Sequence, residues 1–314
     1  MKIIRDNSEL KENCYLVGTI GYFDGIHLGH KKILNKLINE AKSKNGKSIL
    51  ITFWPHPRTV LNQGESVNLL LSENDKHKNL KSFGIDILYI IEFTKEFSKL
   101  SALSFVREFL EKKIQLSKLI IGYNHSFGHN REGNFGYLKK IQDKYSFEIE
   151  EVKKKEINNN LNISSSEIRK KISCGKMFEA RRMLGYNYYI RGIVVKGDGI
   201  GKKINFPTAN IQIENNMSLV PKDGVYAGKA IIENHVFKGM INIGFRPTLE
   251  GKLKRIEINI FDMSKEIYGK SIKIIFIKRI RNEIKFDNLK ELELQLVKDK
   301  KEAIKIIKNE EVRN

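Results

Sequence analysis

The first 150 residues alternate between short apolar runs and stretches in which apolar residues recur at helical spacing. One such stretch holds Leu34 and Leu37 and is predicted to end at Gly46, because glycine commonly closes helices. Another helix is predicted over 101–114, with Ser101 as its N-cap. Strands that alternate with helices predict a mostly parallel sheet covered by helices on both faces. The predicted strands are 15–20, 48–53, 86–93, 118–123 and 147–152.

The pattern changes after Gly185. Helical patterns precede this residue, whereas short β-rich runs separated by Gly, Pro, Asp or Asn follow it, which is typical of a β-barrel or a sandwich. A last helix is predicted over 286–307, with Asp287 as its N-cap. We therefore expect two domains, 1–185 and 186–314, as the length of 314 residues also suggests.

The composition limits the class of protein. A hydrophobic content of 40% is enough for buried cores. The longest apolar runs are far shorter than the ~20 residues of a membrane helix, and the N-terminus has no apolar signal core. The chain has two cysteines, Cys14 and Cys174, so we expect a reducing cytoplasm and no disulfide framework.

The net charge of +20 raises the question of nucleic-acid binding. The lysines are scattered among acidic residues and have few aromatic neighbours, which does not favour a dedicated nucleic-acid surface. A positive field would still attract anionic nucleotides toward a site.

The turn after the first predicted strand carries the most distinctive chemistry. Its sequence, GYFDGIHLGH, places His27 and His30 where a helix begins, and free N–H groups and the helix dipole attract phosphate there. In an open parallel sheet this turn also lies where ligands bind. A phosphate cradle, a zinc pair and a purely structural turn are all compatible with the motif. Zinc would need partners from Cys14, Cys174, His125 or His129, which show no regular second ligand pair.

Motifs in both halves resemble those of the prokaryotic bifunctional riboflavin kinase/FAD synthetase family. The resemblance covers nearly the whole chain, in the family's order, and implies a Rossmann-like nucleotidyltransferase domain followed by a β-barrel riboflavin kinase domain that ends in a helix. In the first half the motifs are GTIGYFDGIHLGH (18–30), TFWPHP (52–57), LSALSFVREFL (100–110), GYNHSFGHNREGN (122–134) and ISSSEIR (163–169). In the second half they are GDGIGKKINFPTANI (197–211), DGVYA (223–227), NIGFRPT (242–248) and IEINIFDMSKEIYG (256–269).

The resemblance implies that the first half adenylylates FMN with ATP, giving FAD and pyrophosphate. His27 and His30 would stabilise the attacked triphosphate, and Asn124 would position phosphate or FMN. The leaving β- and γ-phosphates would be held by Ser164, Ser165 and Arg169. The family pattern also places Gly21, Phe23, Asp24, Gly25 and Gly29 at the ATP, and Pro55, His56, Pro57 and Phe127 at the flavin.

By the same resemblance, the second half phosphorylates riboflavin at its 5′-hydroxyl with ATP and Mg²⁺. Thr208 and Asn210 project to one side of an extended chain, and such a pair coordinates Mg²⁺ with the nucleotide phosphates in the family. Glu257 matches the carboxylate that orients or deprotonates the hydroxyl. Gly197, Gly201 and Lys202 would contact ATP, and Phe206 would contact the flavin.

Three positions depart from the family pattern. Lys202 stands where the family often has Arg, so a point charge replaces a bidentate contact. Asn205 replaces the Gly before FPT, and Asn259 stands where many members have His. These departures bear on kinase rate and flavin affinity more than on the reaction.

Alternative functions use the same residues. HLGH also resembles the ATP motif of class I aminoacyl-tRNA synthetases, and DMSKE (262–266) resembles their K-M-S-K-S, although Asp262 replaces the first lysine. Two further alternatives are a chain that keeps only one of the two activities and a scaffold that only binds nucleic acid. We expect riboflavin, FMN, FAD and ATP as partners, no nucleic acid, no membrane, and a monomer or weak homo-oligomer.

Overall fold

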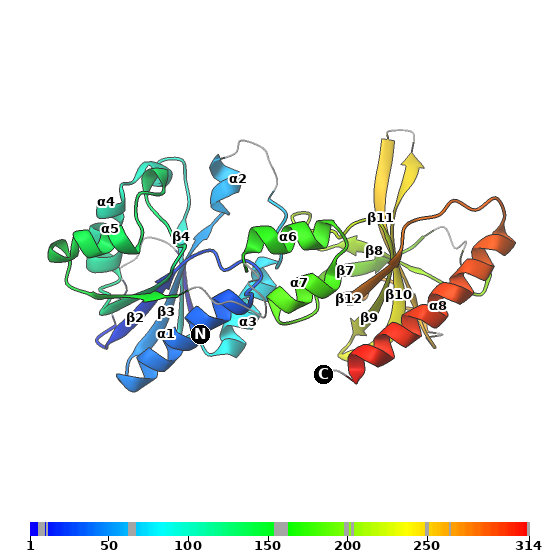
Figure 1. Cartoon of the computed structure of the whole chain (residues 1–314), viewed down its shortest axis with the longest axis horizontal. Helices are drawn as coiled ribbons and strands as arrows, with labels where there is room; N and C mark the ends of the chain where they lie inside the picture. The colour runs from blue at the N-terminus through cyan, green and yellow to red at the C-terminus, as the bar shows by residue number, and fades with distance from the viewer. Residues whose placement is uncertain are drawn as a thin grey trace. The chain divides into compact units, whose positions relative to one another are not determined.

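The computed structural model describes residues 1–5, 10, 12–61, 67–153, 163–197, 201, 204–248, 251–263 and 265–312. The chain forms two compact units (Figure 1). The first comprises residues 1–67 and 73–164, and the second comprises 68–72 and 165–314. The boundary expected after residue 185 concerns the enzymatic domains and stays a prediction.

The first unit is built on a six-stranded sheet in the order β1-β4-β3-β2-β5-β6. All its strand pairs are parallel, so the predicted parallel sheet is confirmed. The carboxyl ends of parallel strands share one edge, which brings the turns after β2, β3 and β5 to the same side. The strands are β1 (Lys2–Arg5), β2 (Leu16–Ile20), β3 (Lys47–Trp54), β4 (Ile87–Glu92), β5 (Lys118–Gly122) and β6 (Glu148–Val152).

Helices cover both faces of this sheet. A hydrophobic cluster on one face includes Leu16 and Ile20 of β2 together with Phe105 and Phe109, while α1 packs on β2, β3 and β5. The helices are α1 (Leu28–Ser43), α2 (Pro57–Leu61), α3 (Glu73–Phe83), α4 (Ala102–Phe105), its π-helical continuation η2 (Val106–Lys113) and α5 (Phe135–Lys140). Short 3₁₀ turns are η1 (Phe97–Lys99), η3 (His129–Arg131) and η4 (Gln142–Lys144).

The helix ends follow from local chemistry. The Ser101 hydroxyl accepts the N–H of Ser104 at 3.1 Å, which confirms the predicted N-cap. The prediction that Gly46 closes α1 is wrong in its detail, because Asn45 takes the left-handed conformation (φ 50°). Gly46 is required for another reason, since a Cβ there would overlap the carbonyl oxygen of Tyr15.

The second unit contains α6 (Ser165–Ser173), α7 (Met177–Leu184) and a closed barrel, which confirms the barrel alternative. The antiparallel strand order is β10-β11-β8-β7-β12-β9. The strands are β7 (Tyr189–Val195), β8 (Ala209–Ile213), β9 (Gly224–Ile232), β10 (His235–Thr248), β11 (Gly251–Ile260) and β12 (Ser271–Arg281).

The last helix, α8 (Leu289–Glu311), packs along the outside of the barrel against β9, β10 and β12 (Figure 1). Its N-cap is Asn288, whose side chain accepts the N–H of Glu291 at 3.0 Å, so the prediction of Asp287 is wrong by one residue. Arg281 donates from Nε and Nη2 to both carboxylate oxygens of the buried Asp299, which ties β12 to α8. Within the described ranges, no helix is long and apolar enough to cross a membrane.

Candidate functional sites

The turn after β2 brings His27 and His30 into contact. His27 is the N-cap of α1, and its Nδ1 accepts the backbone N–H of His30 at 3.2 Å. The two rings stack with centroids 3.6 Å apart and planes 15° from parallel. Gly29 makes this possible, because a Cβ there would lie only 3.1 Å from Cε1 of His27. The pair therefore lies at the positive end of a helix, where an anion is stabilised.

The same turn contains several left-handed residues. Phe23 has φ 55° and Gly25 has φ 81°, and the Phe23 ring lies 4.6 Å from the ring of His30. Asp24 is buried next to them, and the N–H of Gly21 donates to the carbonyl oxygen of Ile51 at 3.0 Å. Backbone strain in a turn of this kind is typical of a functional site.

His30 is held neutral. Its Nδ1 is buried without a hydrogen-bond partner. Burial, and in second place the neighbouring His27, hold the pKa of His30 well below its usual range. A buried polar atom without a partner is unfavourable unless a ligand or water supplies one. The hydroxyl oxygens of Thr19 on β2 and Thr52 on β3 are in the same condition.

The turn after β3 meets the turn after β2 through an aromatic contact. The peptide between Trp54 and Pro55 is cis, and Pro57 begins α2. The His56 ring lies edge-on to the Tyr22 ring at 4.1 Å, and Lys76 of α3 places its Nζ 4.1 Å from the centroid of the same Tyr22 ring. Burial lowers the pKa of Lys76 to about 8, against the opposing influence of Asp24 and Glu73.

The loop after β5 carries Asn124 and Phe127. Asn124 is exposed. Both Asn124 and Ile33 of α1 lie close to Gly122: a Cβ added to this glycine would lie 3.7 Å from Oδ1 of Asn124 and 3.1 Å from Cδ1 of Ile33. Asn124 therefore lies near the helix that His27 begins. Phe127 is buried in the hydrophobic cluster, where its ring lies 5.6 Å from that of Phe105. Its predicted flavin contact stays a prediction.

The serines and arginine of ISSSEIR open α6. Ser164 ends the first unit, whereas Ser165 and Arg169 belong to the second. Arg169 donates from Nε to the carbonyl oxygen of Asn68 at 2.8 Å, which anchors the segment 68–72. The predicted phosphate contacts of these residues stay predictions.

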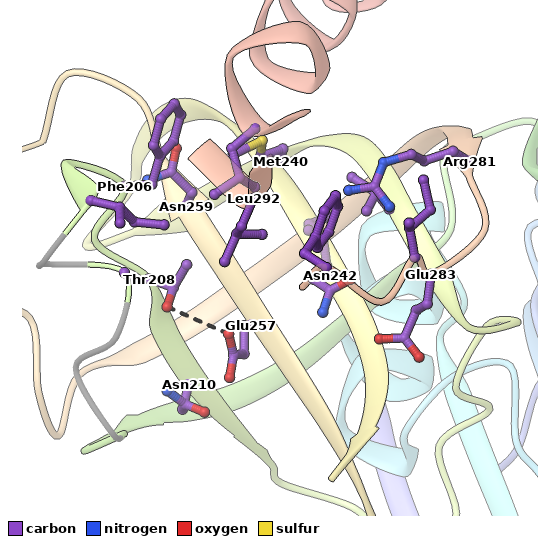
Figure 2. A pocket seen from close by; sticks show the side chains of 17 residues that line it. Phe206, Thr208, Asn210, Met240, Asn242, Glu257, Asn259, Arg281, Glu283 and Leu292 are labelled. Atoms are coloured by element: carbon purple, nitrogen blue, oxygen red, sulfur yellow. Dashed lines mark hydrogen bonds between the residues drawn. The ribbon is translucent and has the colours of Figure 1, made fainter. Parts of the chain in front are cut away.

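A cavity of about 280 Å³ lies between the outer wall of the barrel and α8 (Figure 2). One side is apolar and consists of Ile204, Phe206 and Met240 with Leu292 and Leu296 of α8. The other side is polar and comes from three adjacent strands and the residue before one of them: Thr208 just before β8, Asn210 on β8, Glu257 and Asn259 on β11, and Asn242 on β10. The cavity thus offers a surface for a planar ring next to oxygen and nitrogen donors.

The polar side is a row fixed by strand register. Glu257 pairs with Asn210 on one neighbour and with Asn242 on the other, so the three side chains lie in line across the wall. The Thr208 hydroxyl donates to Oε2 of Glu257 at 3.5 Å (Figure 2). The structure therefore brings together Thr208, Asn210 and Glu257, which the sequence predicted to act on the same phosphoryl group.

The conformation of the loop before β8 depends on its glycine and asparagine residues. A Cβ at Gly197 would overlap the side-chain amide of Asn210, and a Cβ at Gly201 would overlap the carbonyl oxygen of Phe206. Asn205 has φ 57°, so the residue that replaces glycine adopts the backbone conformation that glycine favours. Gly201 lines the cavity, while Lys202 lies outside the described residues.

A second cavity, of about 390 Å³, lies on the other face of β11. Ile258 and Ile260 line it, whereas Glu257 and Asn259 line the first, as the alternation of side chains along a strand requires. The residues Met263, Lys265 and Tyr268 that follow β11 form its rim. Thr208 lines both cavities.

The donor set fits a hard cation rather than zinc. The hydroxyl of Thr208 and the amide oxygen of Asn210 are oxygen donors, which Mg²⁺ prefers. Across the part of the chain that the structure describes, no group of three or more His, Cys, Asp or Glu side chains is placed to hold a metal ion. The predicted alternative of a zinc pair at His27 and His30 therefore has no support among these residues.

Sequence reasoning missed part of the barrel cavity. Asn242 lies in a motif that the sequence singled out without assigning it a role, and its signal was a polar residue within the apolar run 240–243. Arg281 at the end of β12, and Glu283 and Phe286 in the segment between β12 and α8, also line the cavity. No local pattern in the sequence indicates that this segment folds back to Gly244 on β10.

The two sites define a class: a two-part transferase with an HxGH turn on a parallel sheet, typical of nucleotidyltransferases, and a barrel that brings hydroxyl, amide and carboxylate groups together. Comparison with known proteins agrees. Residues 8–167 match the family model of FAD synthetase, and residues 184–307 match that of riboflavin kinase. The chain belongs to the bifunctional riboflavin kinase/FMN adenylyltransferase family and carries both of its enzymatic domains.

Curated relatives with this description align over almost their whole length. That of Buchnera aphidicola (subsp. Schizaphis graminum) is 37% identical over 303 residues, covering 95% of this chain and 96% of the relative. That of Bacillus subtilis is 36% identical over 304 residues, covering 95% of each. That of Escherichia coli K12 is 33% identical over 304 residues, covering 95% of this chain and 96% of the relative.

A solved structure has the same fold. A crystal structure described as a macrolide-efflux protein from Streptococcus pneumoniae aligns with a TM-score of 0.87 and 28% identity, covering 96% of this chain and 98% of that chain.

Proposed function

We propose that the barrel unit transfers the γ-phosphoryl group of ATP to the 5′-hydroxyl of riboflavin, and that the parallel-sheet unit adenylylates the FMN so formed. Both reactions stand in the names of the relatives, and this chain matches both family models over separate residues. The observation that best supports the assignment is the place of Thr208, which lines both barrel cavities and lies beside Glu257.

The cavity under α8 suits the flavin. Met240, Leu292 and Leu296 offer apolar contact to a planar ring system, and the row of Asn242, Glu257 and Asn210 faces the polar ribityl chain. Glu257 and Glu283 in the same cavity would repel a triphosphate.

The second cavity suits the nucleotide. It lies on the opposite face of β11, where Lys265 supplies a positive charge next to the carboxylate of Glu266. With ATP there, its terminal phosphate would reach the flavin hydroxyl past Thr208, the residue that the two cavities share. The predicted contacts of Gly197, Gly201 and Lys202 with the phosphates belong to this proposal, although Gly201 lines the first cavity and not the second.

In phosphoryl transfer, Glu257 orients the 5′-hydroxyl and accepts its proton as the oxygen attacks the γ-phosphorus of ATP. ADP leaves with the electron pair of the broken bond. Thr208 and Asn210 would hold Mg²⁺ together with the phosphate oxygens, and the bound ion supplies charge neutralisation. Thr208 also donates a hydrogen bond to Glu257, which fixes the carboxylate.

In adenylylation, a phosphate oxygen of FMN attacks the α-phosphorus of ATP and pyrophosphate leaves. His27 and His30 lie at the N-terminus of α1, where neutral rings donate N–H groups to the phosphate oxygens. The orphaned Nδ1 of His30 marks a polar position that a ligand would satisfy. Asn124 would align FMN; Ser164, Ser165 and Arg169 would hold the leaving group, and the turns with Pro55, His56 and Phe127 would face the flavin.

Incubation of the chain with riboflavin, ATP and Mg²⁺, followed by chromatography of the flavins, tests both assignments. FMN should appear first and FAD later. FMN without FAD would refute adenylylation. FAD from supplied FMN, with no product from riboflavin, would refute the kinase. The same assay tests the alternative that the chain has kept only one activity, because formation of both FMN and FAD excludes it.

The tRNA-synthetase alternative loses its second motif in the fold. Asp262 and Met263 follow β11 in the turn toward β12, and Met263 lines the proposed nucleotide cavity. The described residues of the pentad therefore belong to the connection between two strands of the barrel.

Location and assembly are also part of the proposal. Cys14 and Cys174 are both free thiols, which suits a reducing cytoplasm. We place the enzymatic boundary after residue 185 and propose a monomer or weak homo-oligomer.

A further inference from the structure

Asn259 ties down the chain just before β8. Its Nδ2 donates to the carbonyl oxygen of Pro207 at 2.7 Å, and its side chain is buried at 6% exposure. Figure 2 shows Asn259 close to Phe206, above Thr208 and Glu257. The asparagine stands on β11 two residues after Glu257, so both side chains point to the same face of the barrel wall.

This hydrogen bond begins where the strand ladder stops. The ladder between β11 and β8 pairs Glu257 with Asn210 and Ile258 with Ala209. Two residues before Ala209, the chain reaches Pro207, which has no N–H to donate to a ladder. The side chain of Asn259 contacts the carbonyl of this residue instead, and so extends the attachment of β8 to β11 beyond the backbone pairs.

The residue that this attachment controls is Thr208. Thr208 shares a peptide unit with the Pro207 carbonyl, lines both cavities and donates to Glu257 at 3.5 Å. On the other side, the segment is shaped by the left-handed Asn205 and by the N–H of Phe206, which donates to Gly201 at 2.9 Å. Rotation of the Pro207–Thr208 peptide would carry the Thr208 hydroxyl away from Glu257.

We infer that Asn259 is a positioning residue for riboflavin phosphorylation: its amide N–H fixes the Pro207 carbonyl and thereby holds the Thr208 hydroxyl beside Glu257. The inference rests on the proposed function of the barrel. It also gives a role to the asparagine that stands where many family members have His, because the side chain at this position must donate a hydrogen bond. A displacement of about 1 Å at a reacting group lowers rates by up to ~100-fold.

Two substitutions remove the donor in different ways. Asn259→Asp keeps the shape and replaces the amide by a carboxylate, whereas Asn259→Leu keeps the size and adds no charge. We expect both to lower kcat of FMN formation roughly 10- to 100-fold. Riboflavin affinity, measured by quenching of flavin fluorescence without nucleotide, should change less than about threefold in Asn259→Leu. FAD formation from supplied FMN should stay at the wild-type rate and reports that the chain is folded.

A double-mutant cycle separates positioning from a direct effect on the flavin. Asn259→Leu is combined with Thr208→Ala, which alone should lower kcat strongly. If Asn259 acts through Thr208, its loss should reduce kcat of the Thr208→Ala chain by less than about threefold. Multiplicative effects of the two changes would overturn the inference.

Three other results would also overturn it. One is loss of riboflavin affinity as large as the loss of kcat, which would make Asn259 a flavin contact only. Another is a lower kcat in Asn259→Asp but not in Asn259→Leu, which would show that the added charge is the cause. The third is a result in which Thr208→Ala lowers kcat of FMN formation while both Asn259 variants keep full activity. Full activity of Thr208→Ala would instead refute the proposed role of Thr208 in the barrel, and the inference with it.

Discussion

The rings of His27 and His30 lie face to face, 3.6 Å between centroids, while the N–H of His30 donates to Nδ1 of His27. Because Nδ1 of His27 accepts this hydrogen bond, the proton of its neutral ring sits on Nε2. A single turn thus caps α1 and orients an imidazole N–H donor. The arrangement explains why the two histidines are separated by two residues and why the residue before His30 is glycine.

Replacement of His30 should separate the two activities. His30→Ala removes a proposed donor to the triphosphate and should lower kcat of FAD formation from FMN by ~100-fold or more. FMN formation from riboflavin should stay within about twofold, because the barrel does not use this residue. Chromatography of both products from one reaction measures the two rates, and an equal loss of both would contradict the division of labour.

Replacement of Glu257 should have the opposite effect. Glu257→Gln keeps the size of the side chain and its contact with Thr208 but removes the base. FMN formation should fall by at least ~100-fold, while FAD formation from supplied FMN should not change. A Glu257→Gln chain that still phosphorylates riboflavin at the native rate would exclude this carboxylate as the base.

Asn205 should tolerate glycine better than alanine. At φ 57° an alanine Cβ is strained, so Asn205→Ala should lower the free energy of unfolding of the barrel by about 1 kcal/mol. Asn205→Gly should stay within roughly 0.5 kcal/mol of the native value. Urea unfolding followed by circular dichroism measures both. The single tryptophan, Trp54 on β3, reports the first unit and serves as the internal control.

His125 should make the first unit sensitive to acid. Its Nε2 is buried without a partner, and burial together with Arg131 lowers the pKa of His125 to about 4. As the pH falls below ~6.5, the unfolded chain binds a proton at this residue that the folded chain does not. Stability is therefore fully retained above that pH and is lost progressively as the pH falls toward 4.

The variant His125→Phe removes this titration. The difference in unfolding free energy between variant and native chain should shift in favour of the variant by about 2 kcal/mol from pH 8 to pH 5. Fluorescence of Trp54 during urea unfolding measures it. His235→Phe, in the barrel, should leave the first-unit transition unchanged. A constant difference across the pH range would show that His125 already takes up its proton in the fold.

Periodicity predicted the elements well where apolar runs are long. The central strands and α1 follow directly from such runs. The strand β1 was missed because its four residues, Lys2–Arg5, are too short for a pattern, and it exists through pairing with β4. The left-handed residue after α1 and the N-cap of α8 were each assigned one residue away, since adjacent Asn, Asp and Gly residues are equally good local candidates.

The barrel site was predictable only in part. Spacing placed Thr208 and Asn210 on one side of a strand, and the family motif selected Glu257. The distance between β8 and β11 in the chain hid the fact that Glu257 stands opposite Asn210 and Asn242. Likewise, the sequence marked Asn259 as a departure but not its contact with Pro207, because register between distant strands is set by packing of the whole barrel.

The separation of the two barrel cavities by β11 bears on the order of events. If flavin and nucleotide occupy opposite faces of one strand, the two ligands meet only at Thr208, which lines both cavities. Spent ADP can then be exchanged for fresh ATP while the flavin stays in place, and FMN can depart without waiting for the nucleotide. The barrel wall thereby permits random-order turnover.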